Sequence, residues 1–236
     1  MFEVRNLAFS YRGHSVLRDV SFVVSPGEVV SVVGGNGAGK TTMLRILSTL
    51  LRPDAGQVLS EGLDAFARPL RYRRQLGYLP ENPALYEDMT VKEYLGYRTV
   101  LKGEPVKRIR RRVNEAVEMC RIGEFLKSSI GGLSNGVKRR VALADAIILR
   151  PRVLLLDDFL AGFDTSLRDL AGTILSEAAA FSSVIVTGHE ISDFVKWTTR
   201  FLVLRGGVIS SIVPSAGANP VELEMRVRAA LNGEAV

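Results

Sequence analysis

The nine-residue run Gly34-Gly35-Asn36-Gly37-Ala38-Gly39-Lys40-Thr41-Thr42 decides the fold of this chain. The apolar stretch before it, at 29–33, predicts a strand, and the amphipathic stretch after it, at 43–51, predicts a helix. Glycines let successive backbone N–H groups curl around an anion, and the start of the following helix points its positive dipole end at the same place. The run therefore predicts a phosphate-binding loop, in which Lys40 contacts phosphate oxygens and Thr41 reaches a bound Mg²⁺.

The composition of the chain limits its class. With 236 residues, of which 47% are apolar, it is long enough to bury a sizeable core as one large domain or as one core with a subdomain. The single cysteine, Cys120, excludes an internal disulfide and fits a reducing compartment, and we expect it to be a core residue of a helix. The first residues lack the order of a secretory signal, and no window is apolar enough to span a bilayer. We therefore expect a soluble, cytoplasmic protein.

The net charge of +6 comes partly from three basic clusters, at residues 68–74, 107–112 and 138–140. Such clusters are most often solvated helix faces, although they also occur where a protein contacts nucleic acid or an anionic membrane. No aromatic residue interleaves with the cluster at 107–112, as a platform for single-stranded nucleic acid would need. We therefore expect these clusters to lie on solvated helix faces.

Alternating strand and helix patterns predict an α/β core that is interrupted by helices. The core takes residues 1–80 and 151–213, and the stretch 81–150 is predicted to be all-helical. The first of its three helices opens at a capping box, Thr90-Val91-Lys92-Glu93, and stops at Gly103. Residues 214–236 are predicted to be a linker and a short terminal helix that packs on the core.

A second element of phosphate chemistry lies far downstream of the glycine-rich run. The apolar stretch 153–156 predicts a buried strand, and it ends in the two carboxylates Asp157 and Asp158. A Mg²⁺ ion bound to phosphate needs an oxygen ligand at a strand end beside the phosphate loop, and Asp157 fits that role. Asp158 points elsewhere and is placed to polarise an attacking water.

In this order the motifs resemble those of the nucleotide-binding subunits of ABC transporters, over nearly the whole chain from residue 2 to about residue 213. The matching stretches are Tyr11 for the aromatic that stacks on adenine, 34–42 for the Walker A loop, 77–81 for the Q-loop, 133–137 for the signature motif, 154–158 for Walker B, 162–164 for the D-loop, and His189 for the switch histidine.

The resemblance implies a P-loop NTPase core of the ABC ATPase type, an α/β fold with a mixed sheet, an antiparallel β part and an inserted all-helical subdomain. It also implies a head-to-tail dimer, in which Ser134 and Gly136 of one chain cover the ATP that is bound to the Walker A loop of the other. Mg²⁺ would be held by Thr41, Asp157 and Glu81. The implied catalytic residues are Asp158, His189 and Glu81.

Four positions depart from the usual pattern of the family. Asp158 stands where a glutamate is expected as general base, and its side chain is one methylene shorter. Asn135 replaces a signature glycine, Val137 replaces a polar residue that is commonly glutamine, and Glu81 replaces the Q-loop glutamine. A misplacement of about 1 Å can lower a rate on the order of 100-fold. These changes predict that nucleotide binding is intact, and that hydrolysis is slow or depends on a partner.

The leading functional prediction is the ATP-hydrolysing subunit of an ABC transporter, of exporter type by the similarity of residues 77–83. Its partners would be an integral-membrane permease subunit and a second ATPase subunit, in a homodimer or heterodimer at the cytoplasmic face of the membrane. A second possibility is an ATP-gated module that binds ATP but hydrolyses little.

A third possibility is a soluble ABC-type ATPase that acts on nucleic acid or the ribosome. Only about fifty residues separate Glu81 from Ser134, which leaves no room for the long coiled coil of the chromosome-type relatives, and the chain has one cassette rather than two. We therefore expect no nucleic-acid partner.

Overall fold

The computed structural model describes residues 1–160, 163, 165–188 and 190–234. Its strands form a four-stranded sheet in the order β2-β1-β4-β5 and a six-stranded sheet in the order β10-β9-β3-β8-β7-β6. The strands are β1 (Phe2–Tyr11), β2 (His14–Val24), β3 (Val29–Val33), β4 (Ala55–Ser60), β5 (Leu63–Asp64), β6 (Leu76–Leu79), β7 (Val153–Leu156), β8 (Ser183–Thr187), β9 (Arg200–Arg205) and β10 (Val208–Pro214).

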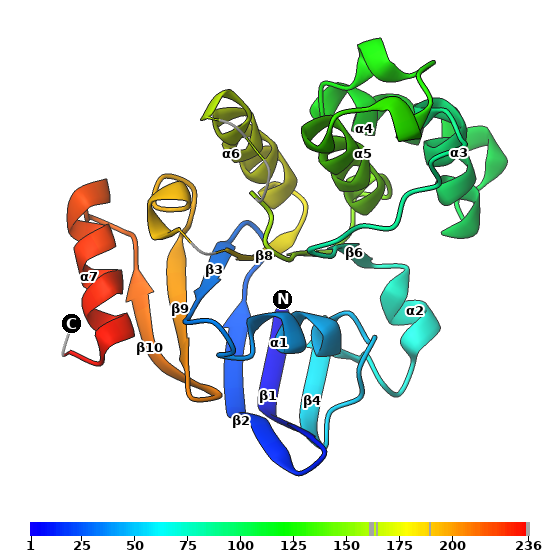
Figure 1. The fold of residues 1–236 in the computed structure, drawn as a ribbon. Coiled ribbons are helices and arrows are strands. Elements are labelled where there is room, and N and C mark those ends of the chain that lie inside the picture. The colour runs from blue at the N-terminus through cyan, green and yellow to red at the C-terminus, as the bar shows by residue number, and fades with distance from the viewer. Residues whose placement is uncertain (161–162, 164, 189, 235–236) are drawn as a thin grey trace.

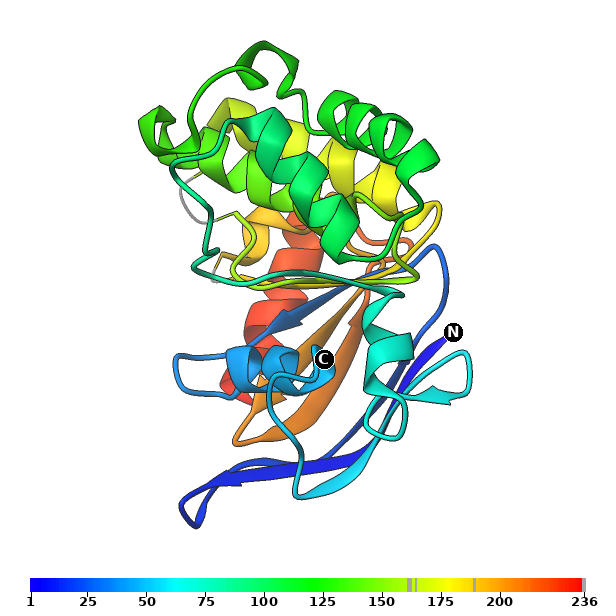
Figure 2. The ribbon, with the colours of Figure 1, turned by 90° about the vertical axis from the view of Figure 1, so that its right-hand side faces the viewer.

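The helices cover both faces of the six-stranded sheet and one of its edges (Figure 1). Those of the stretch 81–150 lie together with α6 in the layer at the top of Figure 2. The α-helices are α1 (Lys40–Leu47), α2 (Pro69–Arg73), α3 (Val91–Leu101), α4 (Val106–Met119), α5 (Asn135–Ile147), α6 (Thr165–Ala179) and α7 (Pro220–Asn232), and short 3₁₀ turns lie at Gly123–Phe125, Ile130–Gly132 and Ile191–Asp193.

The six-stranded sheet is parallel except at its β10 edge. Strands β9, β3, β8, β7 and β6 run in one direction, and β10 pairs antiparallel with β9. Strands β3, β7 and β8 are buried along their whole length and consist mostly of Val, Ile and Leu, which is typical of parallel strands covered on both faces. Because carboxyl ends of parallel strands meet at one edge, the segments that follow β3, β6, β7 and β8 come together there.

Two apolar cores lie on the two faces of this sheet. On one face, α1 is enclosed between the two sheets and buries Met43, Leu44, Ile46 and Leu47 against side chains of β1, β2 and β4. On the other face, side chains of α3, α4, α5 and α6 form the second core. The antiparallel part and the mixed sheet that the resemblance implied are confirmed by the strand pairing.

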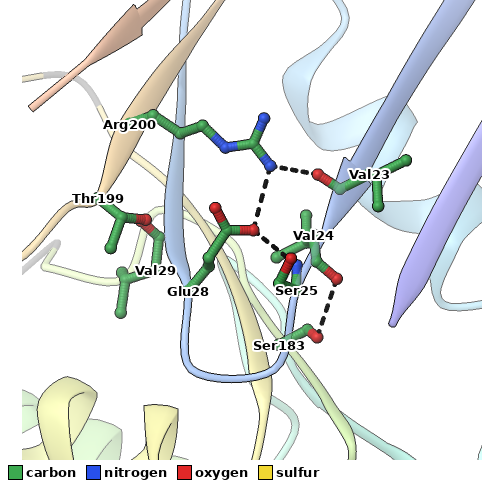
Figure 3. A network of polar contacts seen from close by, with 8 residues as sticks. All are labelled: Val23, Val24, Ser25, Glu28, Val29, Ser183, Thr199 and Arg200. Atoms are coloured by element: carbon green, nitrogen blue, oxygen red, sulfur yellow. Dashed lines mark hydrogen bonds and ion pairs between the residues drawn. The ribbon is translucent and has the colours of Figure 1, made fainter.

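A polar network fixes the amino end of β3, on the side of the sheet away from the glycine-rich run (Figure 3). The Glu28 carboxylate accepts a hydrogen bond of 2.6 Å from the backbone N–H of Ser25 and one of 3.2 Å from Arg200. Arg200 also donates to the carbonyl of Val23 at the end of β2. The turn that carries the chain from one sheet to the other is thus tied to the first residue of β9.

The helical stretch begins as the sequence predicted. Thr90 is the N-cap of α3, and it exchanges hydrogen bonds with Glu93 in both directions, at 2.9 Å and 3.2 Å. The stretch 81–150 then contains α3, α4, α5 and two 3₁₀ turns. The division of the chain into a core of residues 1–80 and 151–213 and a helical subdomain of residues 81–150 stays a prediction.

Some elements differ from the sequence-based expectation. The helix predicted to begin near Lys40 does begin there, but it ends at Leu47 and not at Leu51, because Thr49 takes a left-handed backbone with φ of 62°. Strand β5 and helix α2 have only two and five residues, too few for periodicity to reveal. After the linker 215–219, α7 packs on the core with Leu223, Val227 and Ala230 buried. Cys120 is buried at the end of α4, where burial raises the pKa of its thiol, so it is a core residue as predicted.

Gly77 in β6 allows the close approach of α5, and its substitution gives the first testable prediction. A Cβ at this position would meet the carbonyl oxygen of Ala146 and lie 2.8 Å from Cγ of Pro151. We expect Gly77→Ala to lower the free energy of unfolding by about 2 kcal/mol or more, because backbone must move to accept the methyl group. Urea unfolding measures the change.

The matched control is Gly96→Ala within α3. A Cβ at Gly96 meets nothing within 4 Å, so alanine should raise helix stability there by about 0.5–1 kcal/mol. Equal unfolding midpoints for the two variants would contradict the close packing of α5 on β6.

Candidate nucleotide-binding site

The glycine-rich run links the carboxyl end of β3 to the first residue of α1. Gly37 and Gly39 have φ of 75° and 105°, which side chains rarely adopt. A Cβ at Gly39 would also lie 2.9 Å from Cδ2 of Leu17. These two glycines therefore let the loop turn tightly and bring backbone N–H groups to the amino end of α1, the arrangement that binds phosphate.

Lys40 reaches back across this loop from the start of α1. Its Nζ donates hydrogen bonds to the carbonyl oxygens of Gly34 at 2.7 Å and Gly35 at 3.2 Å. Burial lowers the pKa of Lys40, while the nearby charges of Asp158 and Asp157 act in the opposite direction. The ammonium group therefore lies between the phosphate loop and the two carboxylates, where it is placed to bind an anion.

A cavity of about 380 Å³ opens above the loop. It is formed by the loop, the start of α1 and the residues that follow β6, β7 and β8. The lining residues are Val16, Asn36, Gly37, Ala38, Gly39, Lys40, Thr41, Thr42, Glu81, Asp157, Asp158, Thr187 and Gly188. The structure thus brings together most of the residues predicted to bind nucleotide, metal and water.

Asp157 is the most buried carboxylate of the cavity, with 2% of its surface exposed. Its Oδ1 accepts hydrogen bonds from the hydroxyls of Thr187 at 2.7 Å and Thr41 at 3.3 Å. Its Oδ2 is buried and has no hydrogen-bond partner within the described ranges. Burial raises the pKa of Asp157, the hydrogen bonds from Thr187 and Thr41 lower it, and the net direction is upward.

This arrangement fits a Mg²⁺ ion. A buried carboxylate oxygen without a partner and the hydroxyl of Thr41 are hard oxygen ligands, and Mg²⁺ takes one or two of these together with phosphate oxygens and waters. In the part of the chain that the structure describes, no three His, Cys, Asp or Glu side chains gather tightly enough to hold a metal alone. Thr41 and Asp157, with Glu81 from the lining of the same cavity, are therefore the residues that would hold Mg²⁺ beside a bound phosphate.

Arg139 corrects the expectation that the basic cluster at 138–140 lies on a solvated helix face. Its side chain is buried in α5 and donates to the backbone carbonyls of Glu81 at 2.6 Å, Asp157 at 3.0 Å and Phe159 at 3.0 Å, and also to that of Asp158. Burial lowers the pKa of this guanidinium, and the charges of Asp158 and Asp157 act against that shift. One side chain therefore joins α5 to both segments that carry the carboxylates of the cavity.

Ser134, Gly136 and Tyr11 do not line the phosphate cavity of their own chain. Ser134 is exposed at the N-cap of α5, where its hydroxyl accepts from the N–H of Val137 at 3.4 Å. Tyr11 ends β1, is 41% exposed and packs edge-on against Phe9 with ring centroids 4.7 Å apart. The roles predicted for these three residues therefore stay predictions.

Some predicted site residues lie outside the described ranges, and some residues of the observed site were not predicted from the sequence. His189 and two members of the predicted D-loop, Gly162 and Asp164, are among the residues that are not described. The cavity-lining residues Val16 and Thr187 and the buried Arg139 were not predicted. Thr187 ends the strand next to β7 in the sheet, so the topology could have indicated it, whereas the sequence gives no signal for Val16.

The fold and the cavity define a P-loop nucleotide-binding protein with an ABC-type core. The ABC transporter family matches residues 17–161. A relative from Bacillus subtilis (strain 168), an uncharacterised ABC transporter ATP-binding protein called YxlF, is 32% identical over 89% of this chain and 70% of its own length. The chain therefore belongs to the ABC transporter family.

Two further comparisons agree with this family. The sulfate/thiosulfate import ATP-binding protein CysA of Methylococcus capsulatus is 35% identical over 89% of this chain, which spans 62% of the length of CysA. A solved ATP-binding subunit of an ABC transporter is 28% identical with a TM-score of 0.85, covering 97% of this chain and 99% of that one. The chain thus spans about two thirds of the length of the curated relatives described here.

No helix within the described ranges is both long enough and apolar enough to cross a membrane.

Proposed function

We propose that this chain binds Mg-ATP in the cavity above the phosphate loop and hydrolyses it to drive movement of a substrate across a membrane. The observation that carries the proposal is the convergence of Lys40, Thr41, Asp157 and Asp158 at the carboxyl ends of β3 and β7. A cation, a hydroxyl, a metal-binding carboxylate and a second carboxylate around one cavity are the groups that phosphoryl transfer to water needs.

Each of these residues has a separate role in the proposal. Lys40 and the loop N–H groups bind the phosphates, and bound Mg²⁺ neutralises charge on the phosphate oxygens. Asp158 accepts a proton from the attacking water, and Glu81 assists by orienting water or the metal. His189 is proposed as the switch residue by the resemblance of its motif alone.

A second copy of the chain, or a related ATPase subunit, completes the site in this proposal. The exposed N-cap Ser134 and the following N–H groups of α5 form a helix N-terminus that does not line the phosphate cavity of the same chain. In a head-to-tail dimer, Ser134 and Gly136 would contact the terminal phosphate of ATP bound to the other chain. Tyr11 would stack on its adenine, as an aromatic ring can.

An integral-membrane subunit is the proposed partner on the side of the helical stretch. A second cavity of about 390 Å³ lies between residues 81–87 and the start of α5. Helix α3, whose Tyr97 ring lies 5.9 Å from that of Tyr86, exposes Tyr97, Val100 and Leu101, which are 43%, 53% and 56% accessible. Exposed apolar side chains that gather on one surface are typical of a protein interface. The chain would then work on the cytoplasmic face of a membrane, and the exporter-type resemblance of residues 77–83 stays a prediction.

A second candidate function is an ATP-gated module that binds ATP and hydrolyses little, paired with an active ATPase subunit. Three departures from the family pattern favour it, namely Asp158, Asn135 and Val137. The phosphate loop and Lys40 would serve this function equally well, so turnover is the property that separates the two candidates.

Lys40→Ala tests the proposed binding site. We expect the dissociation constant of Mg-ATP to rise about 10- to 100-fold, because a hydrogen-bonded charge on the phosphates is lost. Isothermal titration calorimetry of the purified chain measures this change, with Lys107→Ala on the exposed face of α4 as the matched control. Unchanged affinity of the Lys40 variant would show that nucleotide does not bind at this loop.

A further inference from the structure

Asp158 has a backbone conformation that few side chains adopt. Its φ is 46°, in the left-handed region, and it is the residue that directly follows the metal-binding carboxylate Asp157. Asp and Asn occupy this region several times more often than other non-glycine residues, and strain of this kind persists only where the surroundings hold it. The shorter aspartate at this position therefore suits the local backbone better than the expected glutamate, but it still requires contacts that fix it.

Two side chains from different elements hold the backbone of Asp158. On the amino side, its N–H donates to Oγ1 of Thr187 at 3.0 Å. On the carboxyl side, its carbonyl accepts from Arg139, which also donates to the carbonyl of Asp157 at 3.0 Å. The peptide units on both sides of Asp158 are thus fixed by groups from β8 and α5.

The direction of the hydrogen bonds at Thr187 is set by its single proton. The Oγ1 of Thr187 lies 2.7 Å from Oδ1 of Asp157, and an ionised carboxylate accepts only, so the hydroxyl donates there. Its oxygen remains available to accept from the N–H of Asp158. Thr187 is 2% exposed, so water does not compete for these bonds.

We propose that Thr187 is a positioning residue whose hydroxyl holds Asp158 in its left-handed conformation and orients Asp157 at the same time. This inference rests on the proposed function of Asp158 in activating water. The hydroxyl ties the proposed metal ligand to the proposed water-activating residue, and both carboxylates line the phosphate cavity. It also occupies Oδ1 of Asp157, which leaves the unpartnered Oδ2 as the oxygen available to Mg²⁺.

Two comparisons isolate the hydroxyl of Thr187. The first is between the native chain and Thr187→Val, which is close in shape to threonine but cannot hydrogen-bond. The second is between Thr187→Ser and Thr187→Ala, which both lack the methyl group and differ from each other in the hydroxyl alone. We expect kcat for ATP to fall about 10- to 100-fold in the Val and Ala variants, because Asp158 loses its fixed position. The KM for ATP should change less than about threefold, and Thr187→Ser should recover most of the turnover, since the loop and Lys40 are untouched.

The matched control is Thr99→Val. Thr99 is also fully buried, and its hydroxyl donates to the carbonyl of Leu95 at 2.6 Å within α3. Thr99→Val therefore also removes a buried hydrogen bond from a hydroxyl, but at a position far along the chain from the phosphate loop. We expect kcat of this variant to stay within about twofold of the native value. If kcat fell equally in Thr187→Val and Thr99→Val, the cause would be a general loss of stability, and this result would overturn the proposal.

A second readout does not depend on turnover. Hydrogen exchange of the Asp158 amide, followed by NMR, should be at least about tenfold faster in Thr187→Ala than in Thr187→Ser, because the amide has lost its acceptor. Equal exchange in the two variants would overturn the role of Thr187, and so would equal kcat in the two variants if the native chain hydrolyses ATP. Failure of the proposed function would look different, since a native chain that neither binds nor hydrolyses ATP would still show the difference in exchange.

Discussion

Asp158→Asn is expected to lower kcat for ATP by about 10²- to 10⁴-fold while leaving the affinity for Mg-ATP within about twofold of the native value. Asparagine has nearly the same shape as aspartate and also tolerates a positive φ, so the backbone at φ of 46° should persist. The amide cannot accept a proton from water at neutral pH, so the substitution removes only the ability of the side chain to act as a base. Steady-state phosphate release and calorimetry on the same preparations measure the two quantities.

Asp158→Glu is the companion variant because it keeps a carboxylate and lengthens the side chain. Turnover in the Glu variant together with none in the Asn variant would show that a carboxylate is required at this position. Equal turnover of the native chain and the Asn variant would remove Asp158 from the role of general base. The cavity would then have to obtain its base from another residue, for which Glu81, a further carboxylate of its lining, is the candidate.

Arg139→Met is expected to have the largest effect on stability. The guanidinium donates to four backbone carbonyls, those of Glu81, Asp157, Asp158 and Phe159, and methionine fills the space without donating to any. Leaving buried acceptors unpaired should lower the free energy of unfolding by about 3 kcal/mol or more. Turnover should fall as well, because the segments that carry both carboxylates lose their link to α5. Urea unfolding followed by circular dichroism measures the stability.

The neighbouring residue provides a matched control. Arg140 in the same helix donates to one carbonyl, that of Arg121 at 2.8 Å, and its guanidinium lies 5.6 Å from the ring centroid of Phe125. We expect Arg140→Met to cost about 1 kcal/mol, in keeping with one hydrogen bond and one contact to an aromatic ring. Equal losses in the two variants would contradict the central position of Arg139.

The sequence predicted the parts of the site that depend on strand ends. The apolar stretches before Gly34 and before Asp157 identify buried parallel strands, and such strands bring the loop and the carboxylates to one edge of a sheet. The capping box at Thr90 likewise marks a helix start through local chemistry alone. These features are encoded within a few residues, so they can be read without a structure.

The parts that the sequence did not reveal depend on contacts between distant segments. Arg139 lies in a run of three basic residues that is indistinguishable from a solvated helix face, and its partner Glu81 is 58 residues away along the chain. The hydroxyl of Thr187 bonds to residues 29 and 30 positions earlier. In our proposal these contacts hold the left-handed backbone of Asp158, which an aspartate tolerates better than most residues.

Hydrolysis at this cavity is tested most directly by phosphate release from the purified native chain with saturating ATP, measured in the presence of Mg²⁺ and in excess EDTA. We expect release that is saturable in ATP and lost when the metal is removed, because Thr41 and Asp157 present oxygen ligands beside the phosphate loop. A chain that binds ATP tightly at Lys40 and releases no phosphate with Mg²⁺ present would contradict hydrolysis by Asp158 and would favour the ATP-gated module.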